Sequence, residues 1–293
     1  MPSSPLLLTT IDECRAWSRE ARKTGRLGFV PTMGALHQGH AQLMIEAGRQ
    51  CQHVAASIYV NPTQFGPNED LARYPRTLEA DLALCASVGV KAVFFPTDAI
   101  MYPHGRHHFT AVEVPGLTTI FEGASRPGHF TGVATVVTKL FGIVQPDDAF
   151  FGRKDYQQWL VIRRMTEDLN LPVCLHRVDT VREADGLAMS SRNRYLSPDQ
   201  RLIALTLSRA LNAAKARLKA GETSVATLES CMHDLISAVP AIELDYARIV
   251  HADNLGDMQM VDPSHPESAV ALVAARVGTT RLIDNIMLPD HND

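Results

Sequence analysis

The sequence has no run of Lys or Arg, no long apolar segment and no basic residue ahead of its first leucines. Its 28 Lys and Arg residues against 32 Asp and Glu residues give a formal net charge of -4, so the chain lacks the positive field that holds nucleic acid. No segment reaches the length of a membrane span, and the segment from Met1 to Thr10 has no basic region typical of a signal peptide. We therefore expect no nucleic-acid partner, no membrane partner and a cytoplasmic location.

Cysteine is scarce as well, and two common nucleotide-binding motifs are missing. The five cysteines are Cys14, Cys51, Cys85, Cys174 and Cys231. They are far apart, odd in number and form no Cys-x-x-Cys pair, which argues against a disulfide framework and a metal cluster and favours buried thiols. Neither Gly-x-Gly-x-x-Gly nor a Walker A sequence occurs, so a phosphate site in this chain must be of another kind.

The first half of the chain alternates short apolar runs with helical patterns. The runs Leu27 to Pro31, His53 to Val60 and Lys91 to Pro96 are rich in β-branched or aromatic residues, and helix formers occupy residues 41–50 and 78–88 between them. A fourth unit continues the pattern from residue 132 to 169. Strands separated by helices predict an α/β fold with a doubly wound parallel sheet, in which ligands bind at the carboxyl ends of the strands.

The pattern changes past about residue 180. Ser197-Pro198-Asp199 has an N-cap residue followed by Pro at the first helical position, and it introduces a helix over residues 200–220. A second helix is expected over residues 224–238. Short strands then follow over residues 244–251, 269–277 and 280–285. We therefore expect a Rossmann-like domain over residues 1–180 and a smaller C-terminal α+β domain over residues 181–293.

Two histidines three residues apart follow the first apolar run. His37 and His40 share one face of a helix that begins after Pro-Thr-Met-Gly. A helix N-terminus offers backbone N–H groups and about half a positive charge, so this segment is suited to a nucleoside triphosphate. Alternatively, the two histidines have a structural role or are two ligands of a zinc ion. Zinc proteases have an acidic residue between their histidines, whereas Gln38-Gly39 provides none.

Polar residues at two later positions are candidates for binding a small substrate. Asn61 and Gln64 follow the second apolar run, where their amides could both donate and accept hydrogen bonds; an ordinary turn is the alternative. Arg126 lies in the Gly- and Pro-containing loop from Glu122 to Phe130. That loop is suited to a lid or to anchoring a carboxylate or phosphate, and a solvated Arg in an exposed loop is the alternative.

Two further segments carry groups that could stabilise a phosphoryl group. Lys154 stands between an apolar strand and a helix start, which is where such a cation would be placed, although most lone lysines face solvent. Ser190, Ser191 and Arg192 combine two hydroxyls with a guanidinium. Together with the two histidines, these residues provide directed donors for a phosphate.

These segments resemble one known family. The His-x-Gly-His pattern resembles the signature of the nucleotidyltransferase superfamily, and the flanking Pro31-Thr32-Met33-Gly34 and Ala35-Leu36 narrow the likeness to the pantothenate synthetase family. Met189-Ser190-Ser191-Arg192 resembles the Lys-Met-Ser-Lys-Ser loop of that superfamily. The likeness extends from about residue 27 to 195, with Tyr74-Pro75-Arg76-Thr77 included, and returns at residues 281–285.

The resemblance implies a two-step ligation. ATP would adenylate the carboxylate of pantoate and release pyrophosphate, and the amine of β-alanine would then attack the pantoyl adenylate to give pantothenate and AMP. The first domain would bind ATP and pantoate, and the second would cover the active site. Mg²⁺ would accompany the triphosphate, mostly through phosphate oxygens and water, with Asp81 as the assisting carboxylate. The family also implies a homodimer.

The resemblance further assigns roles to individual residues, with His40 as the proton donor. The catalytic set is His37, His40, Lys154, Ser190, Ser191 and Arg192. The residues assigned to ATP are Pro31, Thr32, Met33, Gly34, Ala35, Leu36, His37, His40, Gly152, Arg153, Lys154, Asp155, Val181, Met189, Ser190, Ser191 and Arg192. The residues assigned to pantoate or β-alanine are Met33, Asn61, Gln64, Arg126 and Gln158.

Two alternative functions and one departure from the family pattern accompany this interpretation. A nucleotidyltransferase that adenylates a phosphate would keep the histidines, but the amides of Gln64 and Gln158 suit a hydroxy acid better. A non-catalytic nucleotide-binding module would have less need of every phosphate-directed residue. Arg153 stands where the family usually has an acidic residue. Since neighbouring side chains in extended chain point in opposite directions, we expect Arg153 to face outward and Lys154 to face the triphosphate.

Overall fold

The computed structural model describes residues 4–67, 69, 71–106 and 108–290. The chain divides into two compact units. The first consists of Met1–Arg153 and Gln157–Asp179, and the second of Lys154–Tyr156 and Thr180–Asp293. Among the described residues, no helix combines the length and apolar character needed to cross a membrane.

A six-stranded sheet forms the centre of the first unit, as far as its residues are described, in the order β1-β4-β3-β2-β5-β6. Every pairing in it is parallel. The strands are β1 (Leu6–Leu8), β2 (Leu27–Thr32), β3 (His53–Ile58), β4 (Ala92–Phe94), β5 (Asp148–Gly152) and β6 (Cys174–Val178). The doubly wound parallel sheet predicted from the sequence is therefore confirmed.

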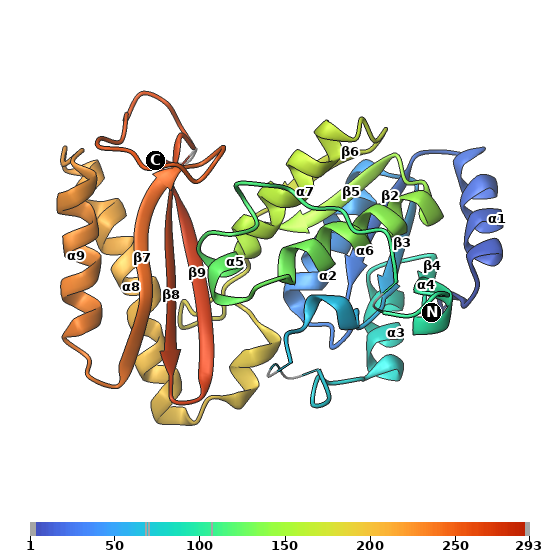
Figure 1. The fold of residues 1–293 in the computed structure, drawn as a ribbon, viewed down its shortest axis with the longest axis horizontal. Coiled ribbons are helices and arrows are strands. Elements are labelled where there is room, and N and C mark those ends of the chain that lie inside the picture. The colour runs from blue at the N-terminus through green and yellow to red at the C-terminus, as the bar shows by residue number, and fades with distance from the viewer. Residues whose placement is uncertain (1–3, 68, 70, 107, 291–293) are drawn as a thin grey trace. The chain divides into compact units, whose positions relative to one another are not determined.

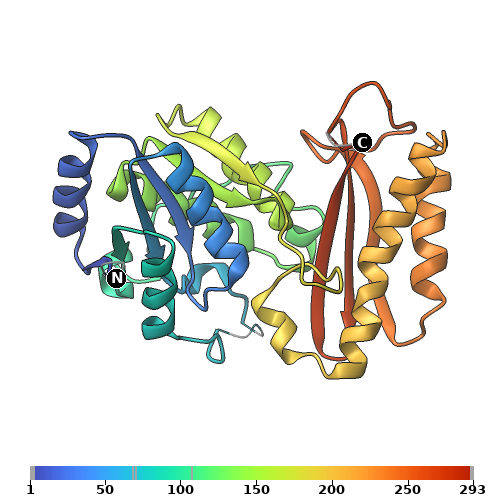
Figure 2. The same ribbon diagram turned by 180° about the vertical axis from the view of Figure 1, so that it is seen from behind.

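Helices cover both faces of this sheet. Figure 1 shows α6 on the face turned toward the viewer, and Figure 2 shows α2 on the opposite face. The helical segments are α1 (Ile11–Arg22), α2 (Gln38–Gln50), η1 (Pro62–Gln64), α3 (Leu78–Ser87), α4 (Asp98–Met101), α5 (Glu122–Ser125), α6 (His129–Val144), η2 (Arg153–Asp155) and α7 (Tyr156–Asp168). Because helices shield both faces, the central strands are apolar on both sides and Phe29, Phe94 and Phe150 are fully buried. Each such ring stabilises the fold by roughly 1.5–3 kcal/mol.

Two strands of the sheet were not expected from the sequence, and both lie at its edges. Strand β1 pairs only with β4, and β6 only with β5, within the described residues. Most of their residues are partly or fully exposed, because an edge strand is covered on fewer sides than a central one. Strand β6 (Cys-Leu-His-Arg-Val) therefore lacks the continuous apolar run that marks β2 and β3, and the apolar run of β1 (Leu-Leu-Leu) is only 3 residues long, which is too short to predict a strand.

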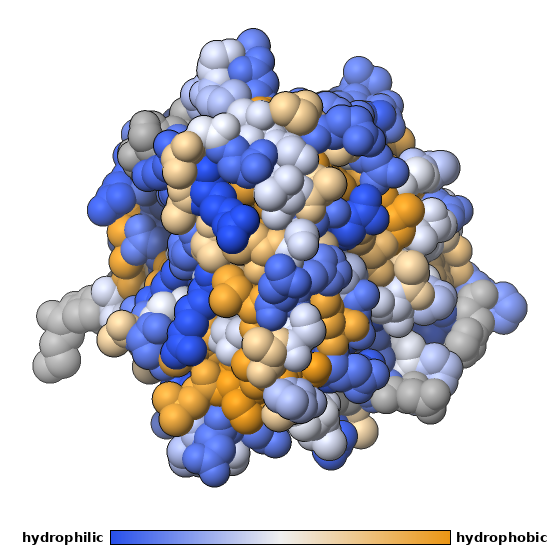
Figure 3. Space-filling model, turned by 90° about the vertical axis from the view of Figure 1, so that its left-hand side faces the viewer, coloured by the Kyte–Doolittle hydropathy of each residue, from blue (hydrophilic) through white to orange (hydrophobic). Residues whose placement is uncertain are grey.

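The second unit packs two helices against an antiparallel sheet, which confirms the expected smaller α+β domain. Its described strands are β7 (Ile242–His251), β8 (Ala269–Val277) and β9 (Thr280–Leu288), in the order β7-β8-β9. Its helical segments are η3 (Ser191–Tyr195), α8 (Pro198–Lys219) and α9 (Val225–Ser237). Ser197 caps α8 with Pro198 in the first turn, as the sequence predicts. Figure 3 views the side of this unit that bears α8 and α9, where apolar and polar side chains are intermixed.

Candidate active site

The loop between β2 and α2 has an unusual backbone that one buried carboxylate holds in place. Gly34 and Ala35 both have positive φ, of 82° and 50°, a region in which Gly is far less strained than other residues. A Cβ on Gly34 would stand only 3.0 Å from an oxygen of Asp81. The turn therefore brings its backbone directly against Asp81, which lies in α3 and is 2% exposed.

The Asp81 carboxylate accepts three hydrogen bonds. Its Oδ2 accepts from the N–H of Ala35 at 3.0 Å, and its Oδ1 accepts from the N–H of Leu36 at 2.8 Å and from the hydroxyl of Thr77 at 3.1 Å. Buried backbone donors need partners, and here a single anion satisfies two of them. These contacts suit a residue that positions the loop, and they differ from those expected of an Mg²⁺ ligand.

His37 and His40 cap the start of α2 reciprocally. His37 is the N-cap residue, and its Nδ1 accepts a hydrogen bond from the N–H of Gly39 at 3.1 Å. The Nδ1 of His40 accepts from the N–H of His37 at 3.3 Å, and the two ring centroids are 4.2 Å apart. Since both Nδ1 atoms act as acceptors, each neutral ring carries its proton on Nε2.

Gly39 makes this arrangement sterically feasible. A Cβ at that position would lie 2.8 Å from Cε1 and 3.0 Å from Nδ1 of His37. The sequence's otherwise unfavourable Gly in the first turn of a helix is thus explained by the close approach of an imidazole. Two Nε2–H donors and the positive end of α2 together suit an anionic group such as a phosphate.

A buried amide network follows β3. The Nδ2 of Asn61 donates to Oε1 of Gln64 at 3.0 Å and to the carbonyl of Gly132 at 3.2 Å, while its Oδ1 accepts from the hydroxyl of Tyr102 at 2.8 Å. Asn61 therefore uses its amide within the protein and fixes the orientation of Gln64. The Nε2 of Gln64 donates to Sδ of Met33 at 3.1 Å. A thioether is a weak acceptor, so this N–H group would bind a substrate oxygen more strongly.

Gly132 lets α6 approach this network closely. A Cβ there would lie 2.5 Å from the carbonyl oxygen of Thr63 and 2.7 Å from Cα of Gln64. Gly132 also provides the carbonyl that accepts from Asn61. The backbone of α6 thus sets the position of Gln64.

Arg126 is held within the first unit by two side chains. Its Nε and Nη2 donate to the two carboxylate oxygens of Glu69 at 2.6 and 2.7 Å, and its Nη1 donates to Nε2 of His129 at 2.9 Å. His129 in turn donates from Nδ1 to the carbonyl of Gln64 at 2.8 Å. Burial, and secondarily the charge of Arg126, lowers the pKa of His129 to about 4, so this ring is neutral and links Arg126 to Gln64.

Gln157, which the sequence analysis did not single out, is the more buried of the adjacent glutamines. Its Nε2 donates to the carbonyls of Leu117 and Ile120 at 2.7 and 2.8 Å, and its Oε1 accepts from the N–H of Glu122 at 3.0 Å. It holds the segment that leads into α5. Gln158, the predicted substrate residue, is half-buried on α7.

Arg153 does not face outward as expected. It is 9% exposed, and its Nη1 lies 3.2 Å from Oδ1 of Asp179. The residues follow β5 as a 3-10 turn (η2) instead of extended chain, so the alternation of neighbouring side chains does not apply. Gly152, the last residue of β5, is half-buried.

In the second unit, β9 anchors the chain around Lys154. The backbone carbonyl of Lys154 accepts from Nδ2 of Asn285 at 2.8 Å, and the hydroxyl of Tyr156 donates to the carbonyl of Ala252 at 3.0 Å. The side chain of Lys154 is largely buried, with Nζ 3.2 Å from Oδ1 of Asp155. The sequence offered no reason to choose Asn285 beyond the family likeness of its segment.

The same strand anchors the segment that contains the two serines. Arg182 donates to both oxygens of the buried Asp284 at 2.7 and 2.9 Å. A backbone hydrogen bond of 2.9 Å joins the N–H of Met189 to the carbonyl of Val181. Ser190 then caps η3 by accepting from the N–H of Arg192 at 3.3 Å, and Ser191 begins that turn. Neighbouring residues of β9, Asp284 and Asn285, thus hold both segments.

Most of the predicted residues therefore fall into two groups, each organised within its own unit. The first group lies at the carboxyl end of β2 and in the segments after β2 and β3, and Arg126 is linked to it through His129. It consists of Pro31, Thr32, Met33, Gly34, Ala35, Leu36, His37, His40, Asn61 and Gln64. The second consists of Lys154, Asp155, Val181, Met189, Ser190, Ser191 and Arg192. These groups are supported by Asp81, His129, Gln157 and Asn285. Their supporting contacts are long-range, so no local sequence pattern indicates them.

Comparisons with known proteins agree on one family. The family model described as Pantoate-beta-alanine ligase matches residues 6–287. A pantothenate synthetase of Pelotomaculum thermopropionicum is 52% identical over 284 residues, covering 97% of this chain and 99% of that protein. The crystal structure of a pantothenate synthetase from Thermus thermophilus has a TM-score of 0.90 at 47% identity, covering 97% and 99% of the two chains. A Francisella tularensis pantoate-beta-alanine ligase complexed with Beta-gamma ATP and Beta-alanine has a TM-score of 0.78 at 31% identity, covering 97% and 98%.

The close approach at Gly39 predicts the effect of adding one methyl group. Gly39→Ala should weaken the binding of a non-hydrolysable ATP analogue at least tenfold, because the new Cβ would displace the imidazole of His37. Gly48→Ala is the matched control, since it lies in the same helix and its Cβ would come no closer than 4.0 Å to another side chain. Isothermal titration calorimetry of both variants measures the difference. Equal affinities would show that the His37 ring position does not matter for nucleotide binding.

The contacts of Asp81 predict that its substitution lowers the affinity for nucleotide and that added Mg²⁺ does not restore this affinity. Asp81→Asn places an NH₂ group against a backbone donor of the loop, so affinity for the ATP analogue should fall at least tenfold at every Mg²⁺ concentration. Thr77→Val, which removes only the hydroxyl contact, should have a smaller effect. Far-UV circular dichroism checks that both variants are folded. Recovery of affinity in Asp81→Asn as Mg²⁺ is raised would instead identify Asp81 as a metal ligand.

Proposed function

Since the chain belongs to the pantoate-beta-alanine ligase family, we propose that it joins pantoate to β-alanine with ATP and that the reaction passes through a pantoyl adenylate. The chain is a ligase. The observation that carries the proposed chemistry is the reciprocal cap of His37 and His40, which directs two Nε2–H donors from the start of α2. Such donors stabilise negative charge that develops on a phosphate.

In the first step, a carboxylate oxygen of pantoate attacks the α-phosphorus of ATP. A P–O bond forms, the bond to the β-phosphate oxygen breaks, and pyrophosphate leaves with the electron pair. Negative charge builds on the phosphate oxygens, and His37 and His40 donate to them, with His40 as the proton donor. Lys154, Ser190, Ser191 and Arg192 contribute further cationic and hydroxyl donors. Loss of one donor of this type commonly raises a barrier by roughly 3 kcal/mol.

In the second step, the neutral amine of β-alanine attacks the carbonyl carbon of the pantoyl adenylate. An amide bond forms, the mixed anhydride bond breaks, and AMP leaves with the electron pair while the amine loses a proton. Gln64 would hold pantoate through its Nε2, which donates to the thioether of Met33, a weak acceptor, and Gln158 would assist. Asn61 acts as a positioning residue for Gln64, because its own amide is engaged within the protein.

The contacts of Arg126 and Asp81 favour structural roles for both residues. Arg126 forms a two-point ion pair with Glu69, so we propose that it orders the loop before α6 through Glu69 and His129 instead of serving as an isolated carboxylate anchor. The Asp81 carboxylate accepts hydrogen bonds from two backbone N–H groups and from the hydroxyl of Thr77. These contacts do not fit a metal ligand. A homodimer remains an expectation from the family resemblance, and a cytoplasmic location remains an expectation from the sequence.

Exchange of pyrophosphate into ATP tests the adenylate directly. With pantoate and Mg²⁺ but no β-alanine, the wild-type protein should incorporate labelled pyrophosphate into ATP, since a reversible first step does not need the amine. His40→Ala should lower both this exchange and net ligation by about a hundredfold. His40→Gln, which keeps an N–H donor, should retain more of each.

His265→Ala is the control, because that histidine lies on an exposed loop paired with Asp262. Net ligation without any exchange, over a range of Mg²⁺ concentrations, would contradict the adenylate. Normal turnover in His40→Ala would contradict the proposed role of the histidine pair.

A further inference from the structure

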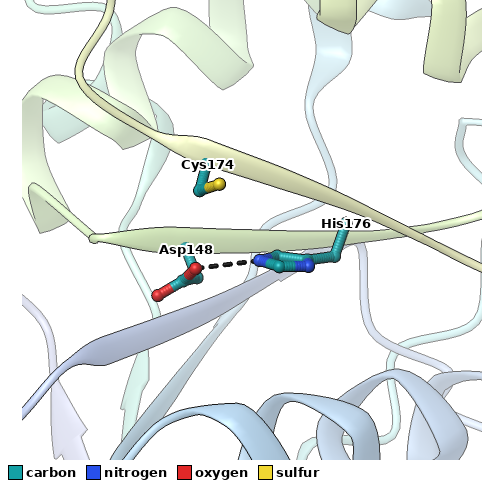
Figure 4. A group of neighbouring side chains, drawn as sticks. All are labelled: Asp148, Cys174 and His176. Atoms are coloured by element: carbon teal, nitrogen blue, oxygen red, sulfur yellow. Dashed lines mark hydrogen bonds and ion pairs between the residues drawn. The ribbon is translucent and has the colours of Figure 1, made fainter.

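Three metal-binding side chains of different kinds meet at the amino end of the parallel sheet. Asp148 is the first residue of β5, Cys174 is the first residue of β6, and His176 follows two residues later. Their candidate ligand atoms all lie within 4.8 Å of one another (Figure 4). The reaction proposed above uses none of them.

The register of the two strands accounts for this convergence. Asp148 pairs with Cys174 and Phe150 pairs with His176 in the parallel ladder. Side chains two residues apart on a strand point to the same face of the sheet, so Cys174 and His176 lie on one face beside Asp148. The group is therefore preorganised by backbone hydrogen bonds within the first unit and does not depend on a flexible loop.

The orientation of the imidazole is fixed as well. The His176 ring stacks on Phe150 with centroids 4.5 Å apart and an angle of 12° between the planes. Its Nε2 lies 2.8 Å from Oδ1 of Asp148. The ring nitrogen thus points at the carboxylate and toward the region where Cys174 lies (Figure 4).

Surrounding donors hold the other oxygen of Asp148. Its Oδ2 accepts from Nε of Arg26 at 2.8 Å and from the thiol of Cys51 at 3.3 Å. Burial opposes ionisation of Asp148, but the hydrogen bonds from Arg26, His176 and Cys51 outweigh it and lower the pKa of the carboxyl. Outer contacts of this type orient the carboxylate ligands of metal sites.

We propose that Asp148, Cys174 and His176 form a binding site for a divalent transition-metal ion of the Zn²⁺ type, with water as a fourth ligand. Thiolate, imidazole and carboxylate are the ligands of zinc, and Zn–ligand distances of about 2.0–2.3 Å place tetrahedral ligand atoms roughly 3–4 Å apart. Shifts of about 1 Å in side-chain position therefore suffice. Mg²⁺ and Ca²⁺ prefer sites made of oxygen atoms and are not suited to this set.

Binding changes protonation in a defined way. The thiol of Cys174 releases its proton as the sulfur–metal bond forms. The proton that Nε2 of His176 donates to Asp148 moves through solvent to Nδ1, so that the neutral imidazole binds the metal through the lone pair of Nε2. The metal replaces the hydrogen bond between His176 and Asp148. Cys174 is exposed, which gives the ion and its water ligand access. The charge of Arg26 on the far oxygen of Asp148 lowers the affinity, and solvent screens it because that side chain is 56% exposed.

Titration with Co²⁺, which takes zinc sites and absorbs visible light, tests the proposal. The wild-type protein, kept reduced, should bind one Co²⁺ ion with a thiolate-to-metal charge-transfer band and the strong visible absorption of tetrahedral cobalt, and Zn²⁺ should displace it. Cys174→Ser should lose the charge-transfer band. His176→Gln should weaken binding at least tenfold.

Cys231→Ser is the matched control, because it removes a buried thiol of the second unit, and it should bind Co²⁺ as the wild type does. Circular dichroism and basal ligation activity should be unchanged in Cys174→Ser, so failure of this site is distinguishable from failure of the proposed reaction. The proposal is overturned if the wild type shows no thiolate-to-cobalt band. It is equally overturned if Cys174→Ser binds with unchanged affinity and spectrum.

Discussion

The reciprocal hydrogen bonding of His37 and His40 is the interaction on which the proposed phosphate chemistry depends. Each ring accepts a backbone N–H on Nδ1, so the helix start and the imidazole tautomers determine one another. The two Nδ1 atoms cap backbone donors at the start of α2. The same hydrogen bonds keep the proton of each neutral ring on Nε2.

Supporting contacts maintain this geometry and the positions of the other candidate residues. Asp81 holds the preceding loop from α3, and Gly39 leaves room for the ring of His37. In the same way, Asn61 orients Gln64, and Asp284 with Asn285 holds the segments around Lys154 and Val181 in the second unit. The chemical groups are thus placed by residues that need not touch a substrate, which is how a fold keeps its catalytic side chains in a narrow range of orientations.

The sequence predicted the parts of the fold and site whose signals are local. Strands β2, β3 and β5 are buried on both faces and appear as continuous apolar runs, and the His-x-Gly-His pattern lies within one turn. Edge strand β6 lacks such a run because it is less buried, and the apolar run of edge strand β1 is only 3 residues long. The role of Asp81 depends on contacts 45 and 46 residues away, and local spacing does not encode them. Arg153 was placed wrongly because alternation was assumed where the chain forms a turn.

Imidazole nitrogen NMR provides the most direct test of this account. Long-range proton–nitrogen correlations, assigned with His37→Gln and His40→Gln, should be recorded at about pH 8, where unperturbed imidazoles are neutral. Both rings should be protonated on Nε2 and unprotonated on Nδ1, and a non-hydrolysable ATP analogue should shift the Nε2 resonances. Protonation of Nδ1 in either ring, or Nε2 resonances that do not respond to saturating nucleotide, would contradict this account.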